Sequence, residues 1–155
     1  EYIHALQVIS REAQQLKHHT SSLLELAQAG NNSKENFMSE IRLDELLFSV
    51  KRLIDFTEPG NKVQIDLSDL LHTDTWVTIT GNTNLLKLAL SNIIQNACKY
   101  SDLQPVIVSL HINADTCIIR IIDKGIGIPE NELKYIYDPF FRASNTTNFQ
   151  GYGVG

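Results

Sequence analysis

The apolar pattern of the sequence changes once along the chain, and this change limits the possible folds. In residues 1–29, apolar or small residues recur at alternating steps of four and three, which is the spacing of a narrow stripe along a bundle or coiled-coil helix. The stripe comprises Tyr2, Leu6, Ile9, Ala13, Leu16, Thr20, Leu23 and Ala27. Because one helix cannot bury such a stripe against itself, we expect a partner helix. The alternative is a helix that packs on its own globular domain.

After a linker predicted at residues 31–40, residues 41–155 mix the periods of helices and strands. The expected class is α+β, with a mixed, mostly antiparallel sheet and helices on one face. On the long helix, the apolar residues at helical steps are Leu85, Leu88, Ala89, Ile93 and Ala97. The predicted elements are helices over 43–54, 84–100 and 130–136, and strands over 63–67, 76–80, 106–112 and 117–122. The last two strands are joined by a hairpin at 113–115, and the strand over 117–122 is expected to be the more buried.

Composition excludes several classes of protein. The 155 residues include 13 Lys and Arg against 18 Asp and Glu, a net charge of −5 that disfavours nucleic acid as the main partner. The sequence has neither an 18-residue apolar run nor a signal peptide, so we expect a cytoplasmic domain; whether a parent protein is membrane-anchored is left open. Two cysteines, Cys98 and Cys117, are too few for a disulfide scaffold.

The long helix carries polar residues that need an explanation. Asn92 and Asn96 stand four residues apart on one helix face, followed by Lys99 and Tyr100. Asparagine is a poor helix former, and one reason for its presence is an amide oxygen offered to Mg²⁺. Lys99 would place a charge near phosphates, and the Tyr100 ring could lie along a planar base. Each residue alone is more simply explained as a solvated helix residue.

A second motif follows the last predicted strand. Asp123 stands at the strand end, and Gly125 and Gly127 follow at alternate positions, before Ile128 and Pro129. A carboxylate here can accept from a hydrogen-bond donor such as the exocyclic amine of adenine, while the glycines let backbone approach a ligand. A dinucleotide-binding fingerprint is excluded because its third glycine is missing. Taken alone, the motif could equally be a tight turn.

A third motif occupies the last residues of the chain. Phe140 and Arg142 lie in an aromatic segment, a polar stretch over 143–150 follows, and Gly151, Gly153 and Gly155 alternate at the end. The polar stretch is typical of a mobile loop, and alternating glycines can turn backbone N–H groups toward an anion. The alternative is a flexible tail.

Together the motifs resemble the N, G1, F and G2 boxes of sensor histidine kinases of two-component signalling, in that order. The boxes are Asn92-x-x-x-Asn96-Ala97-x-Lys99-Tyr100-Ser101, Asp123-x-Gly125-x-Gly127-Ile128-Pro129, Asp138-Pro139-Phe140-Phe141-Arg142 and Gly151-x-Gly153-x-Gly155. Four boxes in order within about 65 residues make coincidence very unlikely. The resemblance covers roughly residues 43–155 and implies a Bergerat-type α/β sandwich that binds ATP under a mobile lid. More weakly, residues 1–30 resemble the second helix of that family's dimerisation and phosphoacceptor domain.

The resemblance also implies roles for single residues. Asn96 would hold Mg²⁺, Asn92 and Lys99 would lie near the phosphates, Tyr100 beside the nucleotide, and Asp123 on the adenine amine. Gly125 and Gly127 would lie by the base, and Gly151, Gly153 and Gly155 by the phosphates. The boxes also bring Ile128, Phe140 and Arg142 into the expected ATP site.

Two departures bear on activity. Related ATPases and serine kinases often carry a glutamate base one turn before the metal asparagine, where this chain has Asn92. An amide cannot take a proton at neutral pH, which favours a histidine kinase. None of the five histidines, His4, His18, His19, His72 and His111, begins the family's acceptor motif. We therefore expect the acceptor to lie outside this chain and the chain to be truncated at its last glycine box.

The expected partners are a dimerisation and phosphoacceptor domain and a response regulator receiver domain, in a homodimeric parent protein. The alternatives are a regulatory nucleotide-binding module derived from a kinase, and an ATPase or serine kinase of the same fold.

Overall fold

The computed structural model describes residues 38–72, 77–113, 116–138, 141–147 and 149, and six residues near the N-terminus. The chain divides into two compact units, Glu1–Met38 and Ser39–Gly155. In the first unit the described residues before 38 are helical and exposed; they are Tyr2, Ala5, Leu6, Ile9, Ser10 and Ala13. The predicted N-terminal helix is confirmed at these positions. Its remainder and residues 31–37 of the predicted linker lie outside the described residues.

The second unit follows the predicted order of elements with three additions and one change. Its elements are β1 (Ser39–Arg42), α2 (Leu43–Thr57), β2 (Val63–Asp66), the 3₁₀ helix η2 (Ser68–His72), β3 (Thr78–Gly81), α3 (Thr83–Tyr100), β4 (Val106–Ile112), β5 (Cys117–Ile122), and the 3₁₀ helices η3 (Glu130–Tyr135) and η4 (Ser144–Thr146). Strand β1 and the 3₁₀ helices η2 and η4 were not predicted, and the short helix predicted over 130–136 is a 3₁₀ helix. Trp76, the expected start of the second strand, and residues 114–115 of the hairpin lie outside the described residues.

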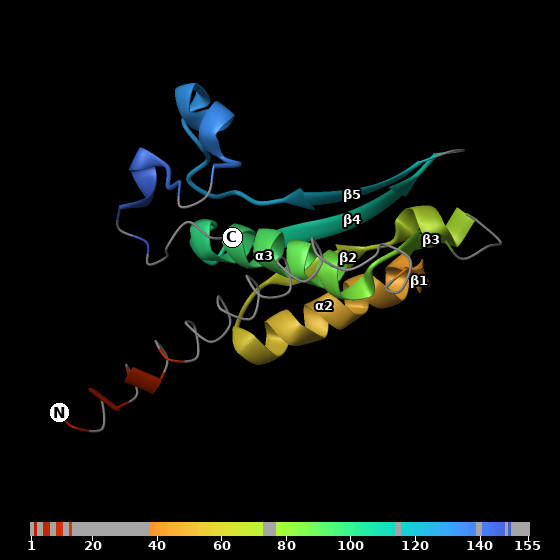
Figure 1. The fold of residues 1–155 in the computed structure, drawn as a ribbon, viewed down its shortest axis with the longest axis horizontal. Helices are drawn as coiled ribbons and strands as arrows, with labels where there is room; N and C mark the ends of the chain where they lie inside the picture. Colours follow the sequence, from red (N-terminus) through yellow and green to blue (C-terminus); the bar gives the residue numbers. More distant parts are fainter. Residues whose placement is uncertain are drawn as a thin grey trace. The chain divides into compact units, whose positions relative to one another are not determined.

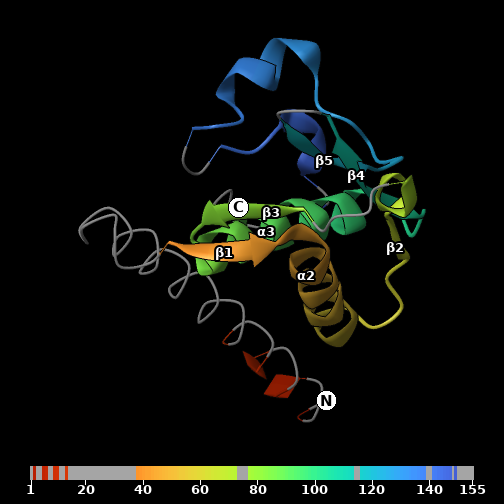
Figure 2. The same cartoon turned by 90° about the vertical axis from the view of Figure 1, so that its right-hand side faces the viewer.

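The strands pair in two groups. β1 pairs antiparallel with β3, while β2 pairs in parallel with β4, which pairs antiparallel with β5. Figures 1 and 2 show α2 and α3 on the same side of the β4–β5 pair. The expected α+β class, with mixed pairing and helices on one face of the sheet, is thereby confirmed. It is the architecture of a helix layer on a sheet layer, with the core between them.

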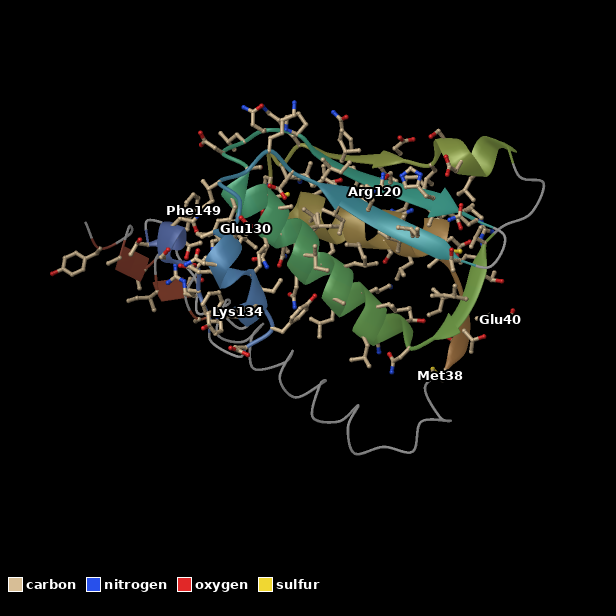
Figure 3. The ribbon with its side chains drawn as sticks, turned by 90° about the horizontal axis from the view of Figure 1, so that it is seen from above. Met38, Glu40, Arg120, Glu130, Lys134 and Phe149 are labelled. Carbon is tan, nitrogen blue, oxygen red and sulfur yellow. The ribbon has the colours of Figure 1, made fainter. Side chains whose placement is uncertain are left out.

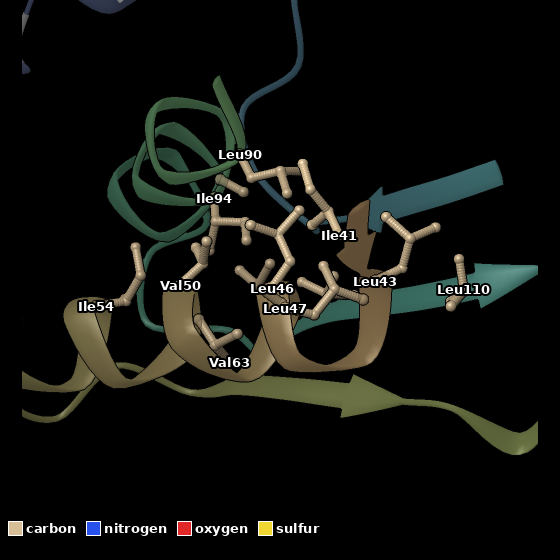
Figure 4. Packing of buried hydrophobic residues seen from close by; sticks show 13 residues of the cluster. Ile41, Leu43, Leu46, Leu47, Val50, Ile54, Val63, Leu90, Ile94 and Leu110 are labelled. Carbon is tan, nitrogen blue, oxygen red and sulfur yellow. The ribbon is translucent and has the colours of Figure 1, made fainter. Parts of the chain in front are cut away.

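The core lies where α2, α3 and the inner face of β4 meet (Figure 4). The predicted apolar face of α2 is buried throughout: Leu43, Leu46, Leu47, Val50 and Ile54 are each at most 3 % exposed. Val106, Val108 and Leu110 alternate along β4 and are also buried, as the period of a strand requires. The amphipathic pattern of α2 and the alternation of β4 therefore define the two facing layers.

Two expectations about burial were wrong. On α3 the buried apolar residues are Leu90, Ile94 and Ala97, whereas Ile93, expected on the apolar face, is 52 % exposed. The helix is apolar on more than one side, so its sequence alone does not select the face that meets the sheet. The strand β5, expected to be the more buried one, alternates between exposed and half-buried residues because, among the described residues, it pairs with β4 alone.

The start of α2 is stabilised by an ion pair. Arg42 donates through Nη2 to Asp44 Oδ2 at 2.6 Å and through Nε to Oδ1 at 3.2 Å. The hydrogen bond from Arg42 lowers the pKa of the Asp44 carboxyl below its ordinary value, so Asp44 is charged at neutral pH. A carboxylate in the first turn also interacts favourably with the helix dipole. This pair joins the end of β1 to the beginning of α2.

The described part of the chain contains no helix long and apolar enough to span a bilayer.

We expect Leu47→Ala to lower the free energy of unfolding by about 2–5 kcal/mol, the range for truncating a buried leucine. Leu47 is 1 % exposed in the centre of the core. The matched control is Phe56→Ala on the same helix, because Phe56 is 84 % exposed and its loss should change stability by about 0.5 kcal/mol or less. Urea unfolding of both variants measures the difference, and equal effects would contradict the packing described here.

Candidate functional site

The candidate site is built around the C-terminal end of α3. The helix begins at Asn82, whose side-chain oxygen accepts from the N–H groups of Asn84 and Leu85. It ends at Ser101, whose hydroxyl donates to the carbonyls of Cys98 and Gln104. Capping at both ends holds α3 as a continuous helix of 18 residues. A regular helix places residues 92, 96 and 99 on one face, as the sequence predicted.

The two asparagines lie on the side of α3 that is not packed in the core. Asn96 is exposed and Asn92 is half-buried, and Ile93 between them is also exposed. Neither asparagine makes a side-chain hydrogen bond to another residue in the described part of the chain. An unengaged amide oxygen on an exposed face is suited to a hard cation or a polar ligand, so the donor chemistry fits the predicted magnesium role.

Lys99 and Tyr100 form a short chain of contacts at the end of the helix. The Lys99 ammonium lies 4.9 Å from the centre of the Tyr100 ring, a cation–π distance. On the Tyr100 ring, Phe149 makes an edge-to-face contact with 5.0 Å between ring centres. Figure 3 shows Phe149 and Glu130 at the end of the domain away from Glu40. The structure thus brings a basic group and two aromatic rings together there.

The loop after β5 is fixed against the same helix end. Asp123 Oδ1 accepts from the N–H of Gly125 at 2.8 Å, and the N–H of Ile126 donates to the Tyr100 carbonyl at 3.2 Å. A Cβ at Gly125 would lie 2.5 Å from the Tyr100 oxygen, so no side chain fits. The second oxygen of the Asp123 carboxylate makes no hydrogen bond within the described residues, and Asp123 is exposed. This oxygen can therefore accept from a ligand.

Arg142 organises the segment that follows. Its Nη2 donates to the carbonyls of Thr146 at 2.9 Å and Phe149 at 2.5 Å, which holds these two residues close to Arg142. We call the described residues 142–147 and Phe149 the cover segment. Phe141, just before it, packs against Tyr135 of η3 with 5.7 Å between ring centres.

Among the predicted site residues, contacts join Lys99, Tyr100, Asp123, Gly125, Gly127 and Arg142 into one network, partly through Phe149 and Asn145. Ile128 is 49 % exposed and makes no recorded polar contact within this network. Phe140, Gly151, Gly153 and Gly155 lie outside the described residues. The sequence analysis missed Glu132, Asn145 and Phe149, of which only Phe149, a single aromatic residue in a polar stretch, offered a signal.

A hollow of about 140 Å³ lies elsewhere, between the turn after α2 and the end of α3. Its lining includes Asn61, Cys98, Ser101 and Gln104 but none of the predicted site residues. Burial raises the pKa of the Cys98 thiol to about 11, so the thiol is protonated at neutral pH. An uncharged thiol is a poor nucleophile, and this hollow has no evident chemistry.

The sequence of residues 81–155 matches the family described as Histidine kinase-, DNA gyrase B-, and HSP90-like ATPase. Among curated proteins, the sensor histidine kinase RcsC of Salmonella typhimurium is 33 % identical over 94 residues, 59 % of this chain and 10 % of that protein. The heme sensor protein HssS of Staphylococcus saprophyticus is 30 % identical over 155 residues, 99 % of this chain and 32 % of that protein. The chain thus spans a third or less of these relatives.

Solved structures of low sequence identity share the fold. The mycobacterial sensor histidine kinase MprB aligns with a TM-score of 0.64 at 22 % identity, over 75 % of this chain and 73 % of that one. The Acinetobacter baumannii histidine kinase AdeS aligns with a TM-score of 0.66 at 18 % identity, over 87 % of this chain and 65 % of that one. The arrangement of helices and strands is therefore that of histidine kinase domains.

We expect Gly125→Ala to lower the free energy of unfolding by about 1–3 kcal/mol, the usual cost of overpacking. Because the methyl group would push the loop away from the Tyr100 carbonyl, the Ile126 amide should lose its partner and exchange faster with deuterium. Urea unfolding and hydrogen exchange measure the two effects. Gly60→Ala is the control: it also strains the backbone, at a φ of +91°, but has open space around it and should leave the Ile126 amide unchanged. Equal exchange in both variants would contradict the close approach.

Proposed function

Because the chain carries a histidine kinase-, DNA gyrase B- and HSP90-like ATPase domain of the sensor histidine kinase type, we propose that residues 39–155 bind Mg-ATP and position it for phosphoryl transfer to a histidine outside residues 1–155. The observation that carries the proposal is the meeting of three segments at Tyr100: the end of α3, the loop of Asp123 and Gly125, and the cover segment. Each of the three contributes residues whose chemistry suits one part of the nucleotide.

The base is recognised by Asp123. Its Oδ1 is held by the Gly125 N–H, which orients the carboxylate, while the other oxygen is available to a donor. Adenine presents an amino group at this edge, whereas guanine presents a carbonyl oxygen that a carboxylate repels. The Tyr100 ring gives the base an aromatic neighbour. The site should therefore prefer ATP to GTP.

The phosphates and the metal ion lie toward Asn92, Asn96 and Lys99. Asn96 offers an amide oxygen as the protein ligand to Mg²⁺, which commonly takes few protein ligands and shares phosphate oxygens. Bound Mg²⁺ would neutralise charge that develops on the transferred phosphoryl group. Lys99 adds a positive charge, and Arg142 is a second cation that could contact phosphate if it exchanged its carbonyl partners for it.

Transfer to a protein histidine is favoured over hydrolysis. Asn92 stands where related ATPases and serine kinases carry a glutamate, and an amide cannot deprotonate water. The domain would therefore act by alignment and electrostatic stabilisation, and the nucleophile would come from elsewhere. None of the five histidines of this chain begins an acceptor motif.

The partners follow from this role. We propose that the chain works in the cytoplasm, in a homodimer, with a dimerisation and phosphoacceptor domain and then a response regulator receiver domain. The N-terminal stripe supports a partner helix, because Leu6 and Ile9 are 65 % and 64 % exposed. Exposed apolar residues at heptad spacing are typical of a helix that is buried by association.

We expect Asp123→Asn to weaken ATP binding by about 1–3 kcal/mol, the cost of losing a charge-assisted hydrogen bond, and to narrow the preference for ATP over GTP. Isothermal titration with both nucleotides measures the two effects. Asp55→Asn, on α2 outside the site, removes one charge and should leave both affinities unchanged. Equal affinity of the unaltered protein for ATP and GTP would contradict the role of Asp123.

We expect Asn96→Ala to slow phosphohistidine formation by about 10- to 100-fold, the range seen when a metal site loses a supporting group. The measurement follows labelled phosphate from Mg-ATP onto the acceptor histidine of the full-length protein. Chelation of Mg²⁺ should stop the transfer, and Asn113→Ala at the β4–β5 turn serves as the control. Steady release of inorganic phosphate without any phosphohistidine would refute the proposal in favour of an ATPase.

A further inference from the structure

The cover segment is tied to the loop of Gly125 and Gly127 by one side chain. Asn145 Nδ2 donates to the Gly127 carbonyl at 3.0 Å and, at a longer 3.4 Å, to the Ile126 carbonyl. Gly127 has a φ of +66°, a conformation that turns the loop here. One amide group therefore reaches two neighbouring carbonyls of the loop that begins at Asp123.

A second side chain ties the cover segment to η3. Glu132 Oε2 accepts from the backbone N–H of Ser144 at 2.9 Å, and Glu132 is half-buried. Ser144 is the first residue of η4, so its N–H has no partner within the helical turn, and the Glu132 carboxylate supplies the acceptor. Glu132 thus holds Ser144 from η3, while the adjacent Asn145 ties the cover segment to the loop of Gly125 and Gly127.

The cover segment is held together by hydrogen bonds among its own residues. Thr146 is 8 % exposed, its N–H and hydroxyl both donate to the Ala143 carbonyl, and its own carbonyl accepts from Phe149 and Arg142. Phe149 in turn contacts Tyr100. Loosening either Glu132 or Asn145 would therefore weaken the attachment of the whole segment.

We propose that Glu132 and Asn145 are positioning residues that hold the cover segment over the nucleotide and set how fast ATP leaves. We call their contacts with Ser144 and with the carbonyls of Ile126 and Gly127 the clasp. The inference rests on the proposed function, since it places the base beside the same loop. The clasp holds that loop and the cover segment together, so ATP bound between them leaves only when the clasp opens.

The test measures dissociation of a fluorescent ATP analogue from the full-length protein by stopped flow. Glu132→Ala and Asn145→Asp should each raise the dissociation rate constant about 3- to 10-fold, the effect of losing one hydrogen bond. Asn145→Asp is nearly isosteric but has no donor for the two carbonyls. Glu132→Gln keeps an acceptor oxygen for the Ser144 N–H and should restore a rate within about twofold of the unaltered protein.

The controls come from η3, where Glu130 and Asn131 are exposed. Glu130→Ala and Asn131→Asp make the same chemical changes outside the clasp and should leave the dissociation rate unchanged. Hydrogen exchange of the peptide covering Ser144 should accelerate in Glu132→Ala and not in Glu130→Ala. Thermal unfolding identifies any variant that fails to fold; if Glu132→Ala or Asn145→Asp does so, the other of the two carries the test.

The outcomes separate the two proposals. If the unaltered protein binds the ATP analogue and the folded Glu132→Ala and Asn145→Asp variants release it at the same rate, the clasp is refuted and the proposed function stands. If the variants and the η3 controls accelerate release equally, the clasp is also refuted. If the unaltered protein does not bind the analogue, the proposed function fails, and the inference fails with it.

Discussion

The close approach of Gly125 to the Tyr100 carbonyl is the constraint on which the candidate site depends. It locks the loop after β5 to the end of α3 through the Ile126 N–H and leaves no room for a side chain. The Asp123 carboxylate takes its orientation from this loop, and so do the carbonyls that Asn145 contacts. The absence of a side chain at this one glycine therefore decides where the Asp123 carboxylate and the carbonyls that contact Asn145 lie.

The helix α3 serves the core and the site at once because opposite sides of it are used differently. Leu90, Ile94 and Ala97 face the core, while Asn92 and Asn96 lie on the less buried side. The packed side fixes the helix, so the polar side chains are presented by a rigid element rather than by a loop. Such support is what precise positioning of a ligand requires.

Much of this arrangement could be predicted from the sequence. Prediction succeeded where a residue type is unusual for its secondary structure, or where the apolar pattern is compatible with only one buried face. The buried face of α2 was predictable because its other positions are mostly polar. The position of Asn92 and Asn96 on one face of α3 was predictable because asparagines are unusual in a helix and these two stand four residues apart. The buried side of α3 could not be predicted, since apolar residues occur around the helix. Strand β1 was missed because it is short and forms only by pairing with distant β3. The contacts of Glu132 and Asn145 depend on tertiary placement, which no local pattern encodes.

The order of pairing has a consequence for how the domain acquires its structure. β1 pairs with β3, and β2, which lies between them in the sequence, pairs with β4. The two pairings therefore interleave along the chain, so each pair of strands encloses a strand of the other pair. Bringing together strands so distant in sequence costs conformational entropy of the chain before their hydrogen bonds and packing compensate for it, and this slows folding. The loop at Gly125 follows the last of these strands, so the candidate site is completed late, after the scaffold has closed. During synthesis on the ribosome, a nascent chain that ends before β4 would leave β2 unpaired and uncover the part of α2's apolar face that packs on β4, a state that favours aggregation or chaperone binding.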